Sequence, residues 1–165
     1  MSAQPEGWQI RGARQQDAAE IARLASVLGY PSDAPAVQGR LGELLAHPDH
    51  RIVVAAPIAA RGRGSADAKI GGWMHEARHL TLESGEFAEI LGLIVDPAAR
   101  RTGLGRLLVA EAERWARVHR LARLTVRSNV ARAESHAFYP ALGFTQAKTQ
   151  RVYTKALGPD AGPVA

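Results

Sequence analysis

The sequence predicts an α/β fold with a mixed, mostly antiparallel central sheet, a β-α-β parallel crossover and flanking helices. Segments with strand character alternate with helical ones along the chain, an order typical of α/β domains. Residues 87–95 are almost continuously apolar, as expected of a strand buried on both faces of a sheet. A glycine-punctuated turn and a long amphipathic helix follow, and a helix between two strands favours a parallel crossover.

The length and composition predict one domain. With 165 residues, 46% of them hydrophobic, the chain is able to bury one sizeable core. No internal repeat or linker divides it. We therefore expect a single domain over residues 1–165, with a core of about residues 8–155 and a disordered tail at residues 158–165.

The first third of the chain predicts a strand and two helices. The strand is expected over residues 8–13, and Asp17 is expected to cap a helix that stops at Gly29. A second helix is expected over residues 37–46, because its apolar residues share one face and His47-Pro48 supplies a stop signal.

The remaining elements predict a sheet around the segment at residues 87–95. Patterns of alternation and turn residues predict the order of these elements. They are strands at 51–56 and 69–75 joined by a mobile Gly-, Arg- and Ser-rich loop at 59–68, a long helix after Gly105, a strand at 121–127, a helix at 132–142 closed by Gly143, and two final strands from Phe144 onward and at 151–155.

Composition also limits the function classes. Cysteine is absent, which excludes disulfides, thiolate metal ligands and a cysteine nucleophile. No stretch of about 20 apolar residues and no apolar leader is present, so we expect a cytoplasmic protein that does not enter a membrane. The net charge of +5 raises nucleic acid as a partner. Because the arginines are scattered and interspersed with glutamates, we expect no nucleic-acid partner.

The segment Arg100 to Arg106 has the character of a phosphate cradle. It lies between the buried strand and a helix start, where backbone N–H groups lack partners inside the helix. Gly103 and Gly105 let the backbone approach an anion without a Cβ in the way, and the arginines add charged donors. A basic tight turn is the competing interpretation. The dinucleotide fingerprint fails because Leu108 stands where a third glycine is needed, and the P-loop pattern is absent.

Motifs before and after this segment resemble one family. Val95-Asp96-Pro97 followed by Arg-x-x-Gly-x-Gly, together with Asn129, Phe138-Tyr139 and Gly143-Phe144, resembles the GNAT family of N-acetyltransferases. The resemblance covers roughly residues 8–155 and is specific for the fold and the acyl donor, but not for the acceptor. It implies acetyl-CoA as cosubstrate, with no metal. A homodimer is compatible with the family, in which dimers are common.

The resemblance also implies which residues bind acetyl-CoA. The turn would hold the pyrophosphate through backbone amides, the buried strand would pair with the pantetheine arm as another strand would, and backbone near Ile94 would polarise the thioester carbonyl. For Arg132, a solvated arginine is an equal alternative. The implied residues are Leu93, Ile94, Val95, Arg100, Arg101, Thr102, Gly103, Leu104, Gly105, Arg106, Asn129 and Arg132.

Two side chains are candidates for acid–base chemistry. A carboxylate within Phe87-Ala88-Glu89-Ile90 is costly to bury and has a raised pKa unless it is paired, so Glu89 is the expected base. Pairing with an arginine is the alternative. The resemblance selects Tyr139 as the acid that protonates the departing thiolate. It also places the acceptor near Tyr30, Trp73, His75, Glu83 and Glu86.

A rival motif is His75-Glu76-Ala77-Arg78-His79, which spells the H-E-x-x-H of zinc hydrolases. That motif requires a helix, whereas the glycines before it favour a strand running into a turn. We therefore place zinc hydrolysis below acyl transfer.

The sequence thus predicts direct transfer of an acetyl group from acetyl-CoA to a primary amine in a ternary complex. A small-molecule amine is preferred. A protein or peptide N-acetyltransferase and a non-catalytic CoA-binding regulatory module remain alternatives.

Overall fold

The structure is a computed structural model that describes residues 7–27, 29–58 and 69–158. The loop expected to be mobile at residues 59–68 and the expected tail beyond residue 158 lie outside the described residues. The chain divides into two compact parts, one up to Arg127 and one from Ser128 onward. Each part is described by itself.

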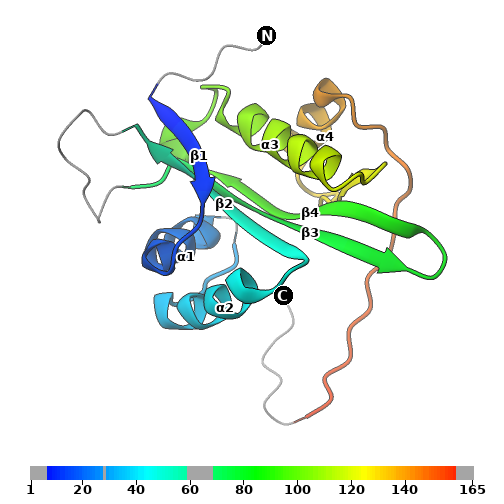
Figure 1. The fold of residues 1–165 in the computed structure, drawn as a ribbon, viewed down its shortest axis with the longest axis horizontal. Helices are drawn as coiled ribbons and strands as arrows, with labels where there is room; N and C mark the ends of the chain where they lie inside the picture. Colours follow the sequence, from blue (N-terminus) through cyan, green and yellow to red (C-terminus); the bar gives the residue numbers. More distant parts are fainter. Residues whose placement is uncertain (1–6, 28, 59–68, 159–165) are drawn as a thin grey trace. The chain divides into compact units, whose positions relative to one another are not determined.

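The first part contains a five-stranded sheet (Figure 1). Neighbouring strands are antiparallel except for the last pair, β4 and β5, which is parallel and is connected through helix α3 (Leu104–Val118). The predicted mixed, mostly antiparallel sheet with one crossover is therefore confirmed. In spatial order the strands are β1 (Trp8–Gly12), β2 (His50–Pro57), β3 (Gly72–Thr81), β4 (Gly85–Val95) and β5 (Leu124–Val126).

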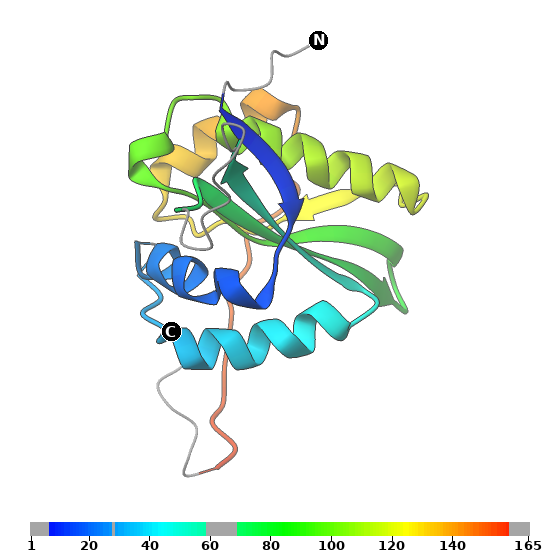
Figure 2. The same ribbon diagram turned by 60° about the vertical axis from the view of Figure 1, so that its left-hand side comes forward.

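Helices cover both faces of this sheet (Figure 2). On one face, α1 (Ala18–Val27) and α2 (Ala34–Ala46) bury Leu24 and Leu41 against β2 and the end of β4. On the other face, α3 packs Leu104 and Trp115 against the sheet. No helix among the described residues is long and apolar enough to cross a membrane.

Strand β4 changes register in its middle. His75 of β3 lies opposite Gly92, but the next residue, Glu76, lies opposite Ile90, so Leu91 is an extra residue on β4. This is a β-bulge, which bends a strand and disrupts its ladder locally. The parallel pairing with β5 covers only Ala88 to Ile90. Within the described residues, positions 91–95 of β4 therefore extend past β5 with no strand on that edge, while β3 pairs with positions 92–95 on the other edge.

Three local predictions are corrected near the first helices and β3. Asp17 does not cap α1; it closes a short 3-10 helix, where its Oδ2 accepts the N–H of Arg14 at 2.7 Å. Helix α2 begins three residues earlier than expected, at Ala34, because Asp33 caps it by accepting the N–H of Ala36. Strand β3 does not end at His75 but continues into a hairpin with β4.

The second part holds helix α4 (Ala133–Phe138) and the 3-10 turn Pro140–Leu142, closed by Gly143 at φ +89°. These elements match the helix expected at 132–142. The two strands expected beyond it are wrong, because no residue from 144 to 158 is in a strand. The segment is mostly polar, and the side chains of Val152 and Tyr153 are 85% and 83% exposed. A strand pair here lacks an apolar face to bury.

Candidate functional site

The turn after β4 leads directly into α3 and is held by its own backbone. Asp96 caps the 3-10 turn Pro97–Ala99 by accepting the N–H of Ala98 at 2.9 Å. The hydroxyl of Thr102 donates to the carbonyl of Ala99 at 2.7 Å. Arg101 and Gly103 both adopt left-handed conformations, at φ +63° and +87°, and such tight turning is easiest for glycine. The turn is therefore well defined in shape.

Helix α3 starts without a side-chain cap. Its first residue follows Gly103, and the N–H of Leu107 makes the first bond back to the Gly103 carbonyl, at 3.0 Å. The N–H groups of the three preceding residues, 104–106, have no acceptor within the helix. The side chains of Arg100, Arg101 and Arg106 are exposed beside them. Such a helix start is an anion site by charge and by hydrogen bonding.

Charged side chains tie this turn to α1. Arg23 of α1 donates to Asp96 at 2.8 Å and to Glu20 at 2.9 Å. Glu20 also accepts the N–H of Ile70 at 3.2 Å. The N–H of Ala98 and the guanidinium of Arg23 lower the pKa of Asp96, so the carboxylate is charged at neutral pH. These contacts of Arg23 therefore fix the end of β4 relative to α1.

The residues expected to bind the pantetheine arm lie on the open edge of β4. Leu93, Ile94 and Val95 all fall beyond the pairing with β5. Ile94 is buried in the core formed with α1 and α2, and Val95 packs in the cluster with Leu104. Because side chains on both faces are held by packing, the backbone between them is presented rigidly along the edge. This edge runs without interruption into the turn and the start of α3.

Glu89 is buried in the middle of β4. Its side chain is 4% exposed and contacts two other side chains of the same compact part. The Nε of Arg127 lies 3.1 Å from its Oε1, and the Nε2 of His79 lies 3.3 Å from its Oε2. The arginine pairing was the competing interpretation of this residue. The structure shows that pairing, with Arg127 just beyond β5, and adds an imidazole.

The H-E-x-x-H segment lies in β3, where its three side chains have separate partners. His75 shares a hydrogen bond with His50, at 2.8 Å between Nε2 and Nδ1, and burial lowers the pKa of His75 to about 4. Glu76 points to the opposite face and accepts from Arg51 at 2.9 Å. No three His, Asp or Glu side chains in the described part of the chain are grouped so as to hold a metal. The helical zinc geometry is not formed.

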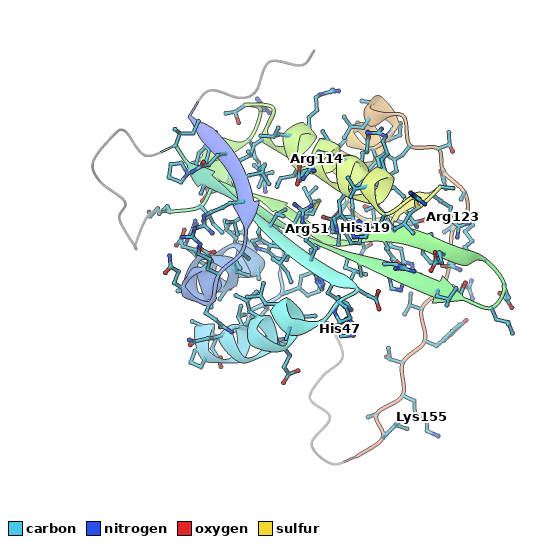
Figure 3. All side chains as sticks on the ribbon, in the orientation of Figure 1. His47, Arg51, Arg114, His119, Arg123 and Lys155 are labelled. Atoms are coloured by element: carbon cyan, nitrogen blue, oxygen red, sulfur yellow. The ribbon has the colours of Figure 1, made fainter. Side chains whose placement is uncertain are left out.

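Glu76 is the buried member of an ionic network that extends from under α3 to the surface. Arg51 and Arg114, labelled in Figure 3, reach the carboxylate of Glu111 from β2 and from α3. Arg51 also donates to Glu76, whose residue is 0% exposed and whose Oε2 has no hydrogen-bond partner. Burial raises the pKa of Glu76 to about 7. The carboxylate of Glu76 is therefore poorly compensated when it is charged.

Three expected site residues belong to the second compact part. Tyr139 follows α4, where its ring packs edge-on against Phe138 and Phe144. Burial raises the pKa of Tyr139, so the phenol keeps its proton at neutral pH. Asn129 has a local role, because its side chain accepts the N–H of Ala131 at 2.9 Å. Arg132 is half-buried and precedes α4.

The expected acceptor residues are dispersed. Tyr30, Glu83 and Glu86 are exposed, the last paired with Arg78 of β3. Trp73 is half-buried beside the α1 and α2 core, and its indole N–H is buried without a hydrogen-bond partner. Trp73 is therefore the member of this set with a buried N–H group that is available to a polar ligand.

Sequence reasoning missed Arg127 and His79 as partners of Glu89. The parallel register places Thr125 opposite Glu89, so Arg127 lies two residues further along the same face of β5. A count of alternation along two hairpin strands could have brought His79 near Glu89. The bulge at Leu91 lies beyond both residues as counted from the hairpin turn, so it leaves that count undisturbed.

Comparison with known proteins agrees with this arrangement. The sequence model described as the acetyltransferase (GNAT) family matches residues 30–144. Aminoglycoside N(6′)-acetyltransferase type 1 of Serratia marcescens is 27% identical over 131 residues, which are 78% of this chain and 86% of that protein.

Solved structures share the fold. Aminoglycoside 6′-N-acetyltransferase AAC(6′)-Ih of Acinetobacter baumannii matches with a TM-score of 0.75 at 18% identity, over 92% of this chain and 100% of that one. Aminoglycoside N-acetyltransferase AAC(6′)-Iy, solved in complex with CoA, matches with a TM-score of 0.77 at 17% identity, over 94% of this chain and 99% of that one.

Proposed function

Because the chain belongs to the GNAT family of acetyltransferases, we propose that it transfers the acetyl group of acetyl-CoA to the primary amine of a small molecule. The observation that carries the proposal is the unpaired edge of β4 at residues 91–95, which runs into the uncapped start of α3. An extended arm suits such an edge, and a pyrophosphate suits such a helix start. The relatives named as aminoglycoside acetyltransferases support a small-molecule acceptor over a protein.

In this proposal one continuous segment of the chain forms the binding site for acetyl-CoA, the acetyl donor. The N–H groups of residues 104–106 and the exposed Arg100, Arg101 and Arg106 hold the pyrophosphate, with Thr102 and Gly103 shaping the turn. Backbone near Ile94 donates to the thioester carbonyl oxygen and stabilises the negative charge that develops there. The CoA complex of the structural relative supports CoA as the donor.

The chemistry is direct transfer in a ternary complex. The amine nitrogen attacks the thioester carbon and the carbon–sulfur bond breaks, so no covalent enzyme intermediate is needed. Glu89 takes the proton from the ammonium group, and Tyr139 gives a proton to the departing thiolate. The raised pKa of Tyr139 favours the protonated phenol that this role requires. Asn129 and Arg132 are proposed to contact the cosubstrate.

The test combines donor binding with turnover. A thermal-shift titration with acetyl-CoA and free CoA measures donor binding, because a ligand of the folded state raises the melting temperature. A panel of kanamycin, spermidine, tyramine and a lysine-containing peptide is then assayed for thiol release and acetylated product. We expect a saturable shift with both CoA compounds and turnover on a small amine. Absence of any CoA-dependent shift refutes the proposal, and turnover on the peptide alone refutes the small-molecule acceptor.

A further inference from the structure

The proposed reaction transfers a proton to a buried carboxyl group, and that proton then has to leave. If Glu89 takes a proton from the acceptor in each cycle, as the proposed function requires, that proton must reach solvent before the next cycle. Glu89 is only 3% exposed. Direct exchange between this carboxyl group and bulk water is therefore hindered, and a neighbouring side chain is needed to carry the proton.

Two side chains within the first compact part contact the carboxylate of Glu89, and they differ chemically. Arg127 lies 3.1 Å away, and a guanidinium group has donors only, with no atom that accepts a further proton. His79 lies 3.3 Å away, and an imidazole accepts a proton on one ring nitrogen and releases one from the other. Of these two contacts, only His79 is able to move a proton.

The position of His79 suits the transfer of a proton from the protein interior to its surface. Its Nε2 is buried, faces Glu89 and makes no hydrogen bond within the described residues, while 34% of the side chain is exposed. The ring stacks on Phe87, with 5.2 Å between the centroids. Stacking holds the ring plane with Nε2 toward the carboxylate, while part of the side chain is exposed to solvent.

The charged surroundings of His79 come from several strands. Glu89 of β4 contacts its Nε2, and Arg127 after β5 contacts the same carboxylate. His50 of β2 is close enough for a charge on His79 to lower the pKa of His50. Arg123, before β5, lies over the ring of Phe87 at 4.6 Å. Of these groups, Glu89 is the one that contacts the imidazole nitrogen directly.

We infer that His79 carries the proton from Glu89 to solvent in each catalytic cycle. The O–H bond of the protonated Glu89 breaks, and a bond forms between that proton and Nε2 of His79. This transfer restores the charged carboxylate and leaves an imidazolium. The proton on Nδ1 then leaves to water or buffer, which gives a neutral imidazole protonated on Nε2. Exchange of that proton for one on Nδ1 through solvent restores the starting tautomer. His79 acts through Glu89 and is a positioning and relay residue, because it need not touch the substrate.

A purely structural role makes a different prediction. If His79 only orients Glu89, then a glutamine, which retains a side-chain donor of similar reach, preserves turnover. If His79 relays protons, then glutamine fails because an amide is too weakly basic to accept a proton from a carboxyl group. The two roles also differ in their response to small added bases, since a missing relay is replaceable by a diffusible imidazole.

The experiment uses the full chain with the best amine of the panel described above. We expect His79→Gln to lower kcat by about 10- to 100-fold, at the lower end of acid–base effects, with the KM for acetyl-CoA unchanged. The kcat of His79→Ala should rise with added imidazole until it saturates. His119→Gln, at the exposed end of α3 (Figure 3), is the control and should keep full kcat.

The outcomes separate this inference from the proposed function. Full kcat in His79→Gln overturns the relay, and so does a loss in His79→Ala that neither imidazole nor higher buffer concentration restores. If Glu89→Gln keeps full turnover, the base assignment in the proposed function is wrong whatever His79 does. If His79→Ala fails to fold, as seen from a lost acetyl-CoA thermal shift, His79→Gln assayed at varied buffer concentration still decides the question.

Discussion

The substitution Glu76→Gln should stabilise the protein at alkaline pH and have little effect at acidic pH. Glu76 is fully buried, and one of its oxygens has no hydrogen-bond partner. Burial raises its pKa from 4.5 to about 7. A group whose pKa is raised on folding contributes stability below the unfolded value, and loses that contribution as the pH rises through the folded value.

The size of the effect follows from the two pKa values. Each tenfold change in a protonation equilibrium corresponds to about 1.4 kcal/mol, so holding Glu76 charged at pH 8 costs the folded state roughly 3 kcal/mol. Glutamine is neutral at every pH, and its carbonyl oxygen is able to accept from Arg51. About 0.8 kcal/mol of this cost is already present at pH 5, so the unfolding free energy of the variant relative to the natural chain should rise by roughly 2.5 kcal/mol between pH 5 and pH 8. For a chain of this size that is roughly 5–10 °C in Tm.

The assay is urea denaturation of both chains at pH 5, 6, 7 and 8, with Glu43→Gln as the control. Glu43 is exposed on α2, and its substitution should change stability by less than about 0.5 kcal/mol. His75 and His50, whose pKa values are lowered, titrate in the same chains and cancel in the difference. A difference between variant and natural chain that is constant from pH 5 to pH 8 would refute the argument.

Three further predictions concern the sheet and the site. Gly72→Ala should cost about 1–3 kcal/mol in denaturation, because a Cβ at this position falls 2.5 Å from the carbonyl oxygen of Ile94. Arg23→Ala should raise the KM for acetyl-CoA about fivefold with kcat nearly unchanged, because loss of its partly exposed pairs frees the turn at Asp96. Tyr139→Phe should lower kcat on the order of 100-fold in steady-state assays, because the phenol proton is lost.

Each of these predictions has a matched control. Gly39→Ala places a Cβ in open space on α2 and should be neutral or stabilising. Arg40→Ala removes an exposed arginine of α2 and should leave the KM for acetyl-CoA unaltered. Phe138→Leu changes the ring beside Tyr139 without removing a proton donor. Equal effects in a variant and its control would contradict the corresponding prediction.

Most of the fold followed from local patterns. The apolar run ending at Val95, the glycines after it and the amphipathic stripe of α3 define the crossover by residue type alone, and the structure confirms it. Helix α2 began earlier than expected because Ala34 and Pro35 carry no periodic signal, whereas the cap at Asp33 does. The predicted final strands do not form, and Val152 and Tyr153 are exposed, because local alternation does not show what a strand would pack against.

The candidate site was less accessible to sequence reasoning. The turn at Gly103 is recognisable from the local sequence, because its glycines are adjacent to the start of α3. The environment of Glu89 is not local: His79 and Arg127 come from different strands, and their contacts depend on register. Register is set by the whole sheet, so composition and spacing near Glu89 identified a costly carboxylate without identifying its partners.

The extra residue in β4 decides on which face of the sheet the Glu89 side chain lies relative to Ile94. Side chains on a regular strand alternate, so Glu89 and Ile94, five positions apart, would face opposite sides. In this strand they share a side, since Ile94 packs with α1 and α2 while Ala88, the neighbour of Glu89, packs under α3. Leu91 thus shifts the alternation of side chains along the strand by one residue. Deleting this single residue would rotate the carboxylate into the layer beneath Trp115 while leaving the donor-binding end of β4 in place.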